Sequence, residues 1–414
     1  MVSREVFKQI FLDHWDGFRE ENPGYGDYQD SVIKKMLGCG DVANGFMAYR
    51  CLDCGELRKV PFSCKSSFCL SCAKVYTEQW VEYISRALFR GMKYRHVVLT
   101  MPEELRKWFQ EDMRLLGQLM KAGHAFYEDA VSYWLKKQVE VGSVVVLQTA
   151  GRSGNYNPHL HILCTSGGMR DGDWHGFGYI DYKIMHRKWQ YHLLNMLREE
   201  VKTSEMAEAV DRCWKKYPKG FVAFIEKGEV PNGGKGLAYY LAKYVVSPPI
   251  SLKRIISYDG QRVRYWYNDH ATGRRFEEEI EAKEFIERMV QHILPKGFQR
   301  VRYYGLQATC RASKVRDEWL ALLEGQDGGT RDTYMVTGNG YRNRIKKSFG
   351  VDPLICCGQE MEFEGIWHPK YGWIVDNWKS FFTEHVHCTA ASTPSIEQEA
   401  DLFSVGKDMV TDYG

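Results

Sequence analysis

The chain of 414 residues has no long uninterrupted hydrophobic run. Its first 21 residues, MVSREVFKQIFLDHWDGFREE, are charged throughout and contain no small-residue cleavage site, so we expect no secretory signal there. No segment has the length and apolarity of a membrane span, and we expect a cytoplasmic protein with no membrane partner. In a reducing compartment the twelve cysteines are expected to be metal ligands or buried thiols, not disulfides.

Four other features are weak or missing. The net charge is only +3, so any affinity for nucleic acid has to come from local basic patches. The sequence has no GxxxxGK[ST] phosphate loop, which argues against ATP hydrolysis, and no HExxH helix, which places a zinc hydrolase last among the hypotheses. There is no internal repeat. With 44% hydrophobic residues, the chain can form two or three globular domains.

Strand-like and helical patterns alternate in the middle of the chain. RHVVLTM, VGSVVVLQT and HLHILCT are rich in β-branched residues and predict strands, with a helical segment over 103–138 between the first two. The turn signal GRSGN at 151–155 predicts that the second and third strands form a hairpin. We therefore predict an α+β fold with an antiparallel sheet and flanking helices, preceded by a small cysteine-rich module. The expected domains are a helical and zinc-binding module at 1–92, a catalytic domain at 93–305 and an accessory region at 306–414 with a disordered tail from about 389.

Two short-spaced cysteine pairs lie in the N-terminal module. Cys51-x2-Cys54 and Cys69-x2-Cys72 are separated by fourteen residues, and each pair forms a knuckle that can direct two thiolates at one ion. Two knuckles complete a closed tetrahedral site, so we predict one structural Zn²⁺ bound by these four residues. Such an ion would help to fold a segment that has little core of its own.

Other cysteines leave alternatives open. Cys64 could replace one ligand or join Cys39 in further binding, and either could also be a small buried side chain. PLICCGQEM, with adjacent Cys356 and Cys357, looks like a remnant of another knuckle, but no partner pair is evident and no second zinc is predicted. The basic residues around the module form either a DNA-contacting rim or a solvated charged face; they are Arg50, Arg58, Lys59, Lys65 and Lys74.

Two histidines stand one residue apart in NPHLHIL. Side chains alternate along a strand, so His159 and His161 share one face and can act as neighbouring metal ligands. In the predicted hairpin Gln148 falls nearly opposite them, and its amide oxygen could be a third ligand. This set leaves positions open for water or a phosphate oxygen, as Mg²⁺ or Mn²⁺ prefers. The alternative is a strand whose polar residues face solvent.

A tyrosine-rich helical segment, GLAYYLAKYV, follows at 236–245. On a helix Tyr240 and Tyr244 lie one turn apart on one face, with Lys243 beside them. Tyrosine can be a covalent nucleophile, and a nearby metal ion would polarise a phosphodiester. Lys243 could lower the pKa of a tyrosine or steady the leaving oxygen. Aromatic residues at this spacing are also common in protein cores.

The chain resembles the HUH superfamily of single-strand DNA nucleases and, within it, the bacterial insertion-sequence transposases that use a pair of tyrosines. The resemblance extends from about residue 30 to about 310. It rests on five motifs in order: CLDCGELRKVPFSCKSSFCLSC, VVLTMPEELR, NPHLHILCTSGG, YLAKYVVSPPIS and FIERMVQHILPKGFQRVRYYG.

This resemblance implies that His159 and His161 bind a catalytic Mg²⁺ or Mn²⁺ and that Tyr240 and Tyr244 are nucleophiles. The expected activity is rolling-circle transposition in the bacterial cytoplasm, on the nucleoid, by cleavage and rejoining of single-stranded DNA at element ends and target through 5′-phosphotyrosine links. Two other hypotheses remain open at this point. One is a replication initiator or relaxase with the same chemistry, and the other is a non-catalytic zinc-dependent DNA-binding regulator.

Overall fold

A computed structural model describes residues 5–89, 91–225, 248–269, 273–324, 352 and 354–376. The chain divides into two compact units. One unit is made by Tyr76–Thr337 together with the first four residues, and the other by Glu5–Val75 together with Gly338–Gly414. Helix α3 (Leu70–Ala87) begins in the second of these units and continues into the first.

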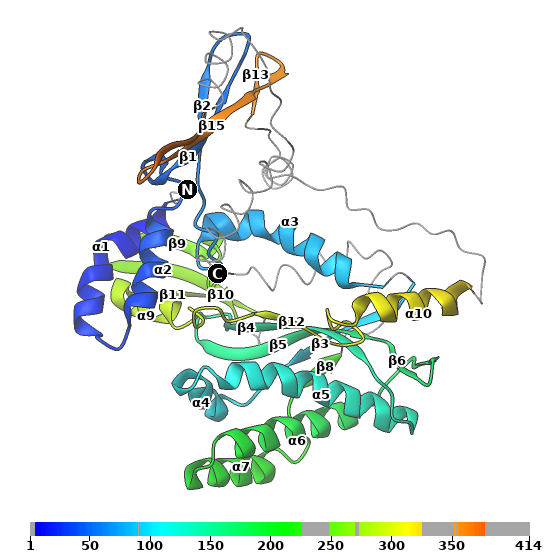
Figure 1. The fold of residues 1–414 in the computed structure, drawn as a ribbon. Helices are drawn as coiled ribbons and strands as arrows, with labels where there is room; N and C mark the ends of the chain where they lie inside the picture. The colour runs from blue at the N-terminus through cyan, green and yellow to red at the C-terminus, as the bar shows by residue number, and fades with distance from the viewer. Residues whose placement is uncertain are drawn as a thin grey trace. The chain divides into compact units, whose positions relative to one another are not determined.

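A five-stranded antiparallel sheet is the centre of the larger unit (Figure 1). Its order is β12 (Val301–Gly305), β4 (Gly142–Ala150), β5 (Tyr156–Thr165), β3 (Tyr94–Leu99) and β8 (Ala223–Ile225). The predicted hairpin between β4 and β5 is confirmed, with Val146 opposite His161 and Gln148 opposite His159. β5 lies in the middle of the sheet, between β4 and β3, and the antiparallel sheet with flanking helices agrees with the predicted α+β fold.

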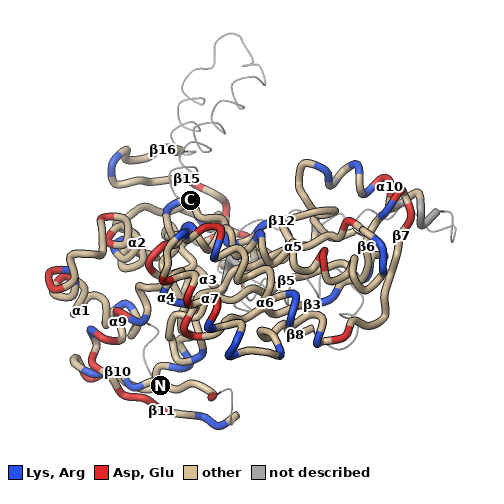
Figure 2. Tube along the Cα trace, turned by 90° about the horizontal axis from the view of Figure 1, so that it is seen from below, with Lys and Arg blue, Asp and Glu red and all other residues tan. Residues whose placement is uncertain are grey.

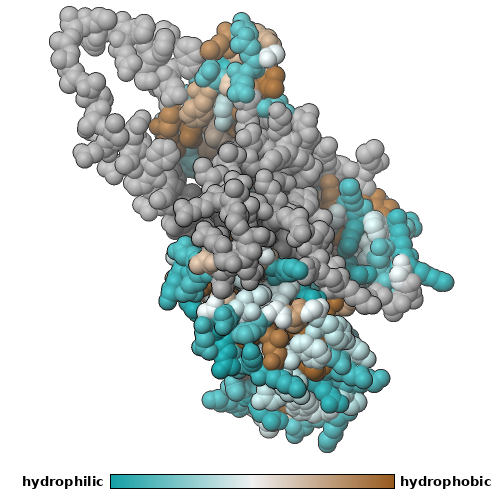
Figure 3. Space-filling view, turned by 90° about the vertical axis from the view of Figure 1, so that its right-hand side faces the viewer, coloured by the Kyte–Doolittle hydropathy of each residue, from teal (hydrophilic) through white to brown (hydrophobic). Residues whose placement is uncertain are grey.

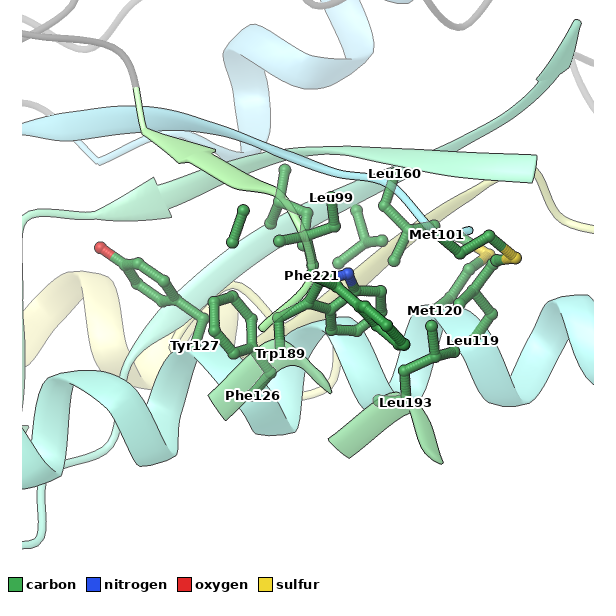
Figure 4. Packing of buried hydrophobic residues seen from close by; sticks show 14 of the residues in the cluster. Leu99, Met101, Leu119, Met120, Phe126, Tyr127, Leu160, Trp189, Leu193 and Phe221 are labelled. Carbon is green, nitrogen blue, oxygen red and sulfur yellow. The ribbon is translucent and has the colours of Figure 1, made fainter. Parts of the chain in front are cut away.

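Helices cover one face of this sheet. They are η2 (Glu103–Leu105), α4 (Arg106–Glu111), α5 (Leu115–Leu135), α6 (Tyr182–Glu200) and α7 (Ser204–Lys216). The apolar side chains of β5 on this face, Leu160 and Ile162, are fully buried against the helices. Since side chains alternate along a strand, the histidines of β5 lie on the opposite face. Figure 4 shows Trp189, Phe126 and Leu193 filling the layer between sheet and helices. The Trp189 indole N–H donates to the Thr100 carbonyl at 2.7 Å, so the buried ring keeps its hydrogen bond.

A second, smaller sheet in the same unit has the order β11 (Arg275–Glu281), β10 (Arg262–Asn268) and β9 (Ile255–Tyr258), preceded by η3 (Leu252–Arg254). β10 carries basic residues and β11 mainly acidic ones, and Figure 2 shows the charged residues along this sheet. Arg262 donates to Glu281 at 2.9 Å and Arg264 to Glu277 at 2.7 Å. Helix α9 (Ala282–Val290) is tied to β11 by Arg288, which donates to both carboxylate oxygens of Glu278 at 2.9 and 3.0 Å. The remaining elements of the unit are β6 (Gly167–Arg170), β7 (Asp173–Gly176) and α10 (Ala312–Glu324).

The other unit combines two N-terminal helices with strands from both ends of the sequence. The helices α1 (Val6–Glu21) and α2 (Asp27–Leu37) are followed by η1 (Val42–Asn44), β1 (Phe46–Arg50) and β2 (Leu57–Pro61). The sheet order is β16 (Gly372–Asp376), β15 (Glu362–His368), β1 and β2, and a two-stranded hairpin, β13 (Ile355–Cys356) and β14 (Gln359–Glu360), precedes β15.

This pairing corrects the predicted division into three consecutive domains. The region 306–414 is not separate, because β15 forms backbone hydrogen bonds with β1 over five residue pairs. Pairing between strands more than 300 positions apart leaves no local pattern in the sequence. The pairing of β1 with β15 could therefore not be predicted from sequence patterns. The tail predicted from about 389 lies outside the described residues.

The described surface in the view of Figure 3 is mainly hydrophilic, and its hydrophobic residues form small separate patches. Among the described helices, none is both long enough and apolar enough to cross a bilayer.

Candidate metal centres and catalytic site

The two histidines of NPHLHIL lie side by side on the central strand. The ring centroids of His159 and His161 are 5.2 Å apart, and His161 is buried whereas His159 is half-buried. Gln148 stands directly opposite His159 across the β4–β5 ladder, and residues opposite each other in such a ladder share a face. The structure thus brings the three predicted ligands of the catalytic metal to one face of the sheet.

Hydrogen bonds orient both imidazoles. Nδ1 of His159 lies 2.7 Å from the Asn157 carbonyl oxygen, which can only accept, so Nδ1 carries the proton and Nε2 presents a lone pair. Nδ1 of His161 lies 3.1 Å from Nε2 of His96 on β3, and the two rings are stacked. Burial lowers the pKa of His159, assisted by the charge of Arg106, and it lowers that of His161 far more, assisted by His159 and His96. Both rings are therefore neutral at pH 7, which is the form that binds metals.

Further groups on this face fit a bound cation. Asn157 lies two residues before His159 on the same face of β5, and its buried Oδ1 accepts no hydrogen bond within the described structure. An oxygen acceptor beside two neutral imidazoles, with the amide of Gln148 opposite, is a mixed nitrogen and oxygen donor set. Such a set fits Mn²⁺ or Mg²⁺ with coordination positions left for other ligands.

The loop between β4 and β5 is fixed from outside the hairpin. Nε2–H of His292 donates to the Gly154 carbonyl at 3.0 Å, so its Nδ1 accepts from the Thr149 hydroxyl at 3.2 Å. Thr149 occupies a β-bulge between Gln148 and Ala150, and bulges are frequent next to functional sites, where they redirect side chains. These bonds hold the end of β4 that carries Gln148.

The predicted nucleophiles, Tyr240 and Tyr244, and the neighbouring Lys243 lie outside the described residues. Their roles remain predictions from the sequence.

A first cluster of cysteines gathers where the β1–β2 hairpin begins and ends. Cys39, Cys64, Cys69 and Cys72 have their sulfur atoms within 4.8 Å of one another. The Sγ atom of Cys72 is 3.5 Å from that of Cys39 and 3.6 Å from that of Cys64, close to the ~3.8 Å edge of a tetrahedron with Zn–S bonds of about 2.3 Å. The backbone N–H of Cys64 donates to the Cys39 sulfur at 3.3 Å, which favours the thiolate form of Cys39. Cys72 lies in the first turn of α3. This geometry supports a closed zinc site.

The predicted single site of Cys51, Cys54, Cys69 and Cys72 is therefore wrong as a set. Cys69 and Cys72 join Cys39 and Cys64, whereas Cys51 and Cys54 form a second cluster with Cys356 and Cys357. The physical reason is the β1–β2 hairpin, whose register runs from Phe46 opposite Pro61 to Arg50 opposite Leu57. Five pairs at roughly 3.4 Å per residue separate the two ends of the hairpin by about 14 Å, far beyond the span of one ion.

Two features of the sites were not found from the sequence. The first is the contact of His96 with His161, although the sequence contained a signal for it. RHVVLTM predicts a strand, and pairing of that strand with β5 places His96 on the same face as His161. The grouping of Cys356 and Cys357 with Cys51 and Cys54 had no signal beyond the adjacent cysteines themselves.

Comparison with known families gives two matches. Residues 142–314 match the family described as "Putative transposase", and residues 10–101 match the "Transposase zinc-binding domain". The first match contains His159, His161 and Gln148, and the second contains all four cysteines of the first cluster. The chain thus combines a region that matches a transposase zinc-binding domain with a following region that matches a putative transposase family.

Within this class, two curated relatives cover most of the chain. It is 28% identical to the "Transposase for insertion sequence element IS801" of Pseudomonas savastanoi pv. phaseolicola, over 84% of this chain and 86% of that protein. It is 26% identical to the "Putative transposase y4qJ" of Sinorhizobium fredii (strain NBRC 101917 / NGR234), over 75% of this chain and 81% of that protein. No solved structure matches the chain.

Proposed function

We propose that this transposase cuts and rejoins single-stranded DNA at the ends of its element, with a metal ion at the His159–His161 face and a tyrosine as nucleophile. The observation that carries the proposal is the pair of neutral imidazoles, His161 buried and His159 half-buried, on the central strand of the antiparallel sheet, with Gln148 opposite. DNA transposition itself follows from the family matches.

His159, His161 and Gln148 would hold the ion, which when bound would polarise a phosphodiester and stabilise the charge of the transition state. The Asn157 carbonyl fixes the His159 ring, and His96 fixes His161, so these rings need no reorientation when DNA binds.

The reaction is proposed as an in-line exchange of esters. The Tyr240 oxygen bonds to phosphorus and the bond to the 3′-oxygen breaks, which leaves the DNA joined to tyrosine through its 5′-phosphate. The tyrosine proton leaves to solvent or a base, and a proton returns to the freed 3′-hydroxyl. The exchange conserves the ester bond and requires no ATP. Tyr244 would perform the same step on the other strand or at the target.

The test is a denaturing gel of the full-length protein with labelled single-stranded DNA from the element ends and Mn²⁺. Wild type should give a slowly migrating covalent adduct, which disappears without metal and in Tyr240→Phe/Tyr244→Phe; the single variants show which tyrosine acts first. Tyr239→Phe is the matched control, since on the predicted helix Tyr239 would point about 100° away from Tyr240, and it should keep the adduct. Tight DNA binding with no adduct from any protein would reject the proposal in favour of a non-catalytic DNA-binding role.

The proposed third ligand has its own test. Gln148→Ala should weaken the binding of Mn²⁺ measured by calorimetry or by electron paramagnetic resonance, because one of three protein donors is removed. An unchanged Mn²⁺ affinity would remove Gln148 from the site.

A further inference from the structure

The second cysteine cluster joins two parts of the chain that are distant in sequence. Cys51 and Cys54 belong to the turn after β1, whereas Cys356 and Cys357 belong to the β13–β14 hairpin, and all four sulfur atoms lie within 4.8 Å of one another. Sγ of Cys54 is 3.6 Å from Sγ of Cys356, which is 4.0 Å from Sγ of Cys357. All four are free thiols, and these separations match the ~3.8 Å edge of a tetrahedral zinc–sulfur site.

We propose that Cys51, Cys54, Cys356 and Cys357 bind a second structural zinc ion, which fastens the C-terminal β13–β14 hairpin to the N-terminal β1–β2 turn. The family match to a zinc-binding domain ends at residue 101, so it contains only half of this site.

The N-terminal half of the site has the form of a metal-binding knuckle. The turn is closed by the Gly55 N–H, which donates to the Cys51 carbonyl at 2.9 Å, and by the Cys51 N–H, which donates to the Glu56 carbonyl at 2.9 Å. Gly55 has a φ of +76°, a conformation in which a side chain would be strained. The turn thereby directs Cys51 and Cys54 to the same point.

The C-terminal half depends on an unusual backbone. β13 and β14 are joined by Cys357 and Gly358, with φ values of 51° and 78°. Two successive positive φ angles define the tight hairpin turn that normally takes Asn-Gly or Gly-Gly, so a cysteine at its first position is unfavourable without a compensating interaction. Metal ligation by Cys357 would supply that interaction, and the turn brings the adjacent Cys356 and Cys357 to bear on one ion.

Independent contacts bring the two halves together. β15, which directly follows β14, pairs with β1 up to Arg50 opposite Glu362. Arg50 also donates to both carboxylate oxygens of Glu364 at 2.8 and 3.0 Å and to the Gly55 carbonyl at 3.1 Å. The Arg58 guanidinium donates to the Ile355 carbonyl at 3.4 Å. The cysteines are therefore held near one another by contacts that do not involve sulfur.

The decisive measurement is the number of zinc ions per chain in the purified full-length protein, determined by inductively coupled plasma mass spectrometry. Wild type should contain two ions, and Cys356→Ser/Cys357→Ser should contain one. Cys39→Ser/Cys64→Ser should also lose one ion, but from the other site. Cys310→Ser is the matched control, because Cys310 is an exposed free thiol in neither cluster, and it should retain two ions. One zinc in wild type, or two in Cys356→Ser/Cys357→Ser, would overturn the proposal.

A second experiment needs no variant and so remains informative if Cys356→Ser/Cys357→Ser fails to fold. Wild-type protein is treated with a maleimide, and the modified cysteines are identified by peptide mass spectrometry. Although Cys54 and Cys357 are exposed, they should react at least tenfold more slowly than Cys310 and reach its rate after chelation. If Cys54 and Cys357 of the zinc-loaded protein reacted with the maleimide as fast as Cys310, metal ligation by these residues would be contradicted.

Discussion

His96 illustrates how a residue with no predicted role can position a proposed metal ligand, His161. It is 2% exposed, and its Nε2 lies 3.1 Å from Nδ1 of His161. Removing the partner that fixes a ligating imidazole commonly costs 10–100-fold in metal affinity. We therefore expect His96→Ala to weaken Mn²⁺ binding by about tenfold or more, as measured by calorimetry on protein that retains its zinc.

Two controls separate positioning from general loss of stability. His96→Gln keeps an amide that can hydrogen-bond to His161, so it should recover part of the affinity. His124→Ala removes a hydrogen bond to Ser143 of β4, away from the histidine pair, and should lower stability without affecting Mn²⁺. Equal Mn²⁺ affinity in His96→Ala and wild type would show that His96 does not position the ligand.

Glu278 on β11, in the smaller sheet of the larger unit, should make the stability of this unit depend on pH. Burial raises its pKa, but hydrogen bonds from Arg288 and Tyr265 outweigh burial, and the pKa lies below its usual value. A depressed folded-state pKa gives stability that is fully present above the unfolded-state value of about 4.3 and is lost as pH falls below it. Glu278→Gln should therefore destabilise the unit by about 1–2 kcal/mol at pH 7, and this difference should shrink below pH ~4. Urea titrations of both proteins at several pH values would reveal it; a difference that is constant with pH would contradict the assignment.

At the level of elements, helix α5 approaches the sheet most closely at a glycine. A methyl group on Gly123 would lie 2.5 Å from Cδ1 of Leu160 and 3.1 Å from Cδ1 of Ile162, on the strand that carries the histidines. Gly123→Ala gains about 1 kcal/mol in helix propensity but overfills the layer, which typically costs 1–3 kcal/mol, so we expect a net loss of stability of up to about 2 kcal/mol.

Gly117 in the same helix is the matched control. A methyl group there would meet only the flexible end of Arg302, at 3.2 Å, so Gly117→Ala should be neutral or slightly stabilising. Thermal unfolding of the two variants measures the difference. If Gly123→Ala proved as stable as Gly117→Ala, the layer would be less tightly packed than the structure indicates.

The same elements show what the sequence could predict. The β4–β5 hairpin was found because its alternation and its turn lie within about 25 consecutive residues, and this placed Gln148 beside the histidines. The ligand sets of the cysteines were not found because they depend on which strand pairs with which. Cys39 and Cys64 meet only when β1 pairs with β2, and Cys51 and Cys356 meet only when β15 pairs with β1. Spacing within a motif carries no information about either pairing.

For the whole molecule, the two units depend on different sources of stability. The larger one has an extensive apolar core between its sheet and α4–α7, whereas the sheet formed by β1, β2, β15 and β16 holds both cysteine clusters. Chelation should therefore abolish the hydrogen-exchange protection of β1 and β2 and leave that of β4 and β5 unchanged. Continued protection of β1 in protein shown to be metal-free would mean that zinc is dispensable for this sheet.

The pairing of β1 with β15 also has a consequence for synthesis on the ribosome. Cys54 and Cys356 are 302 positions apart, so at roughly 5–20 residues per second the N-terminal strand emerges about 15–60 s before its partner. During that interval β1 has an open edge and its knuckle lacks two sulfur atoms. The part of the chain made first thus finishes folding last, and a polypeptide that stops early has a central sheet but an incomplete zinc-binding unit. Pulse-labelled nascent chains should accordingly remain sensitive to protease around residues 46–61 until residue 376 has left the exit tunnel.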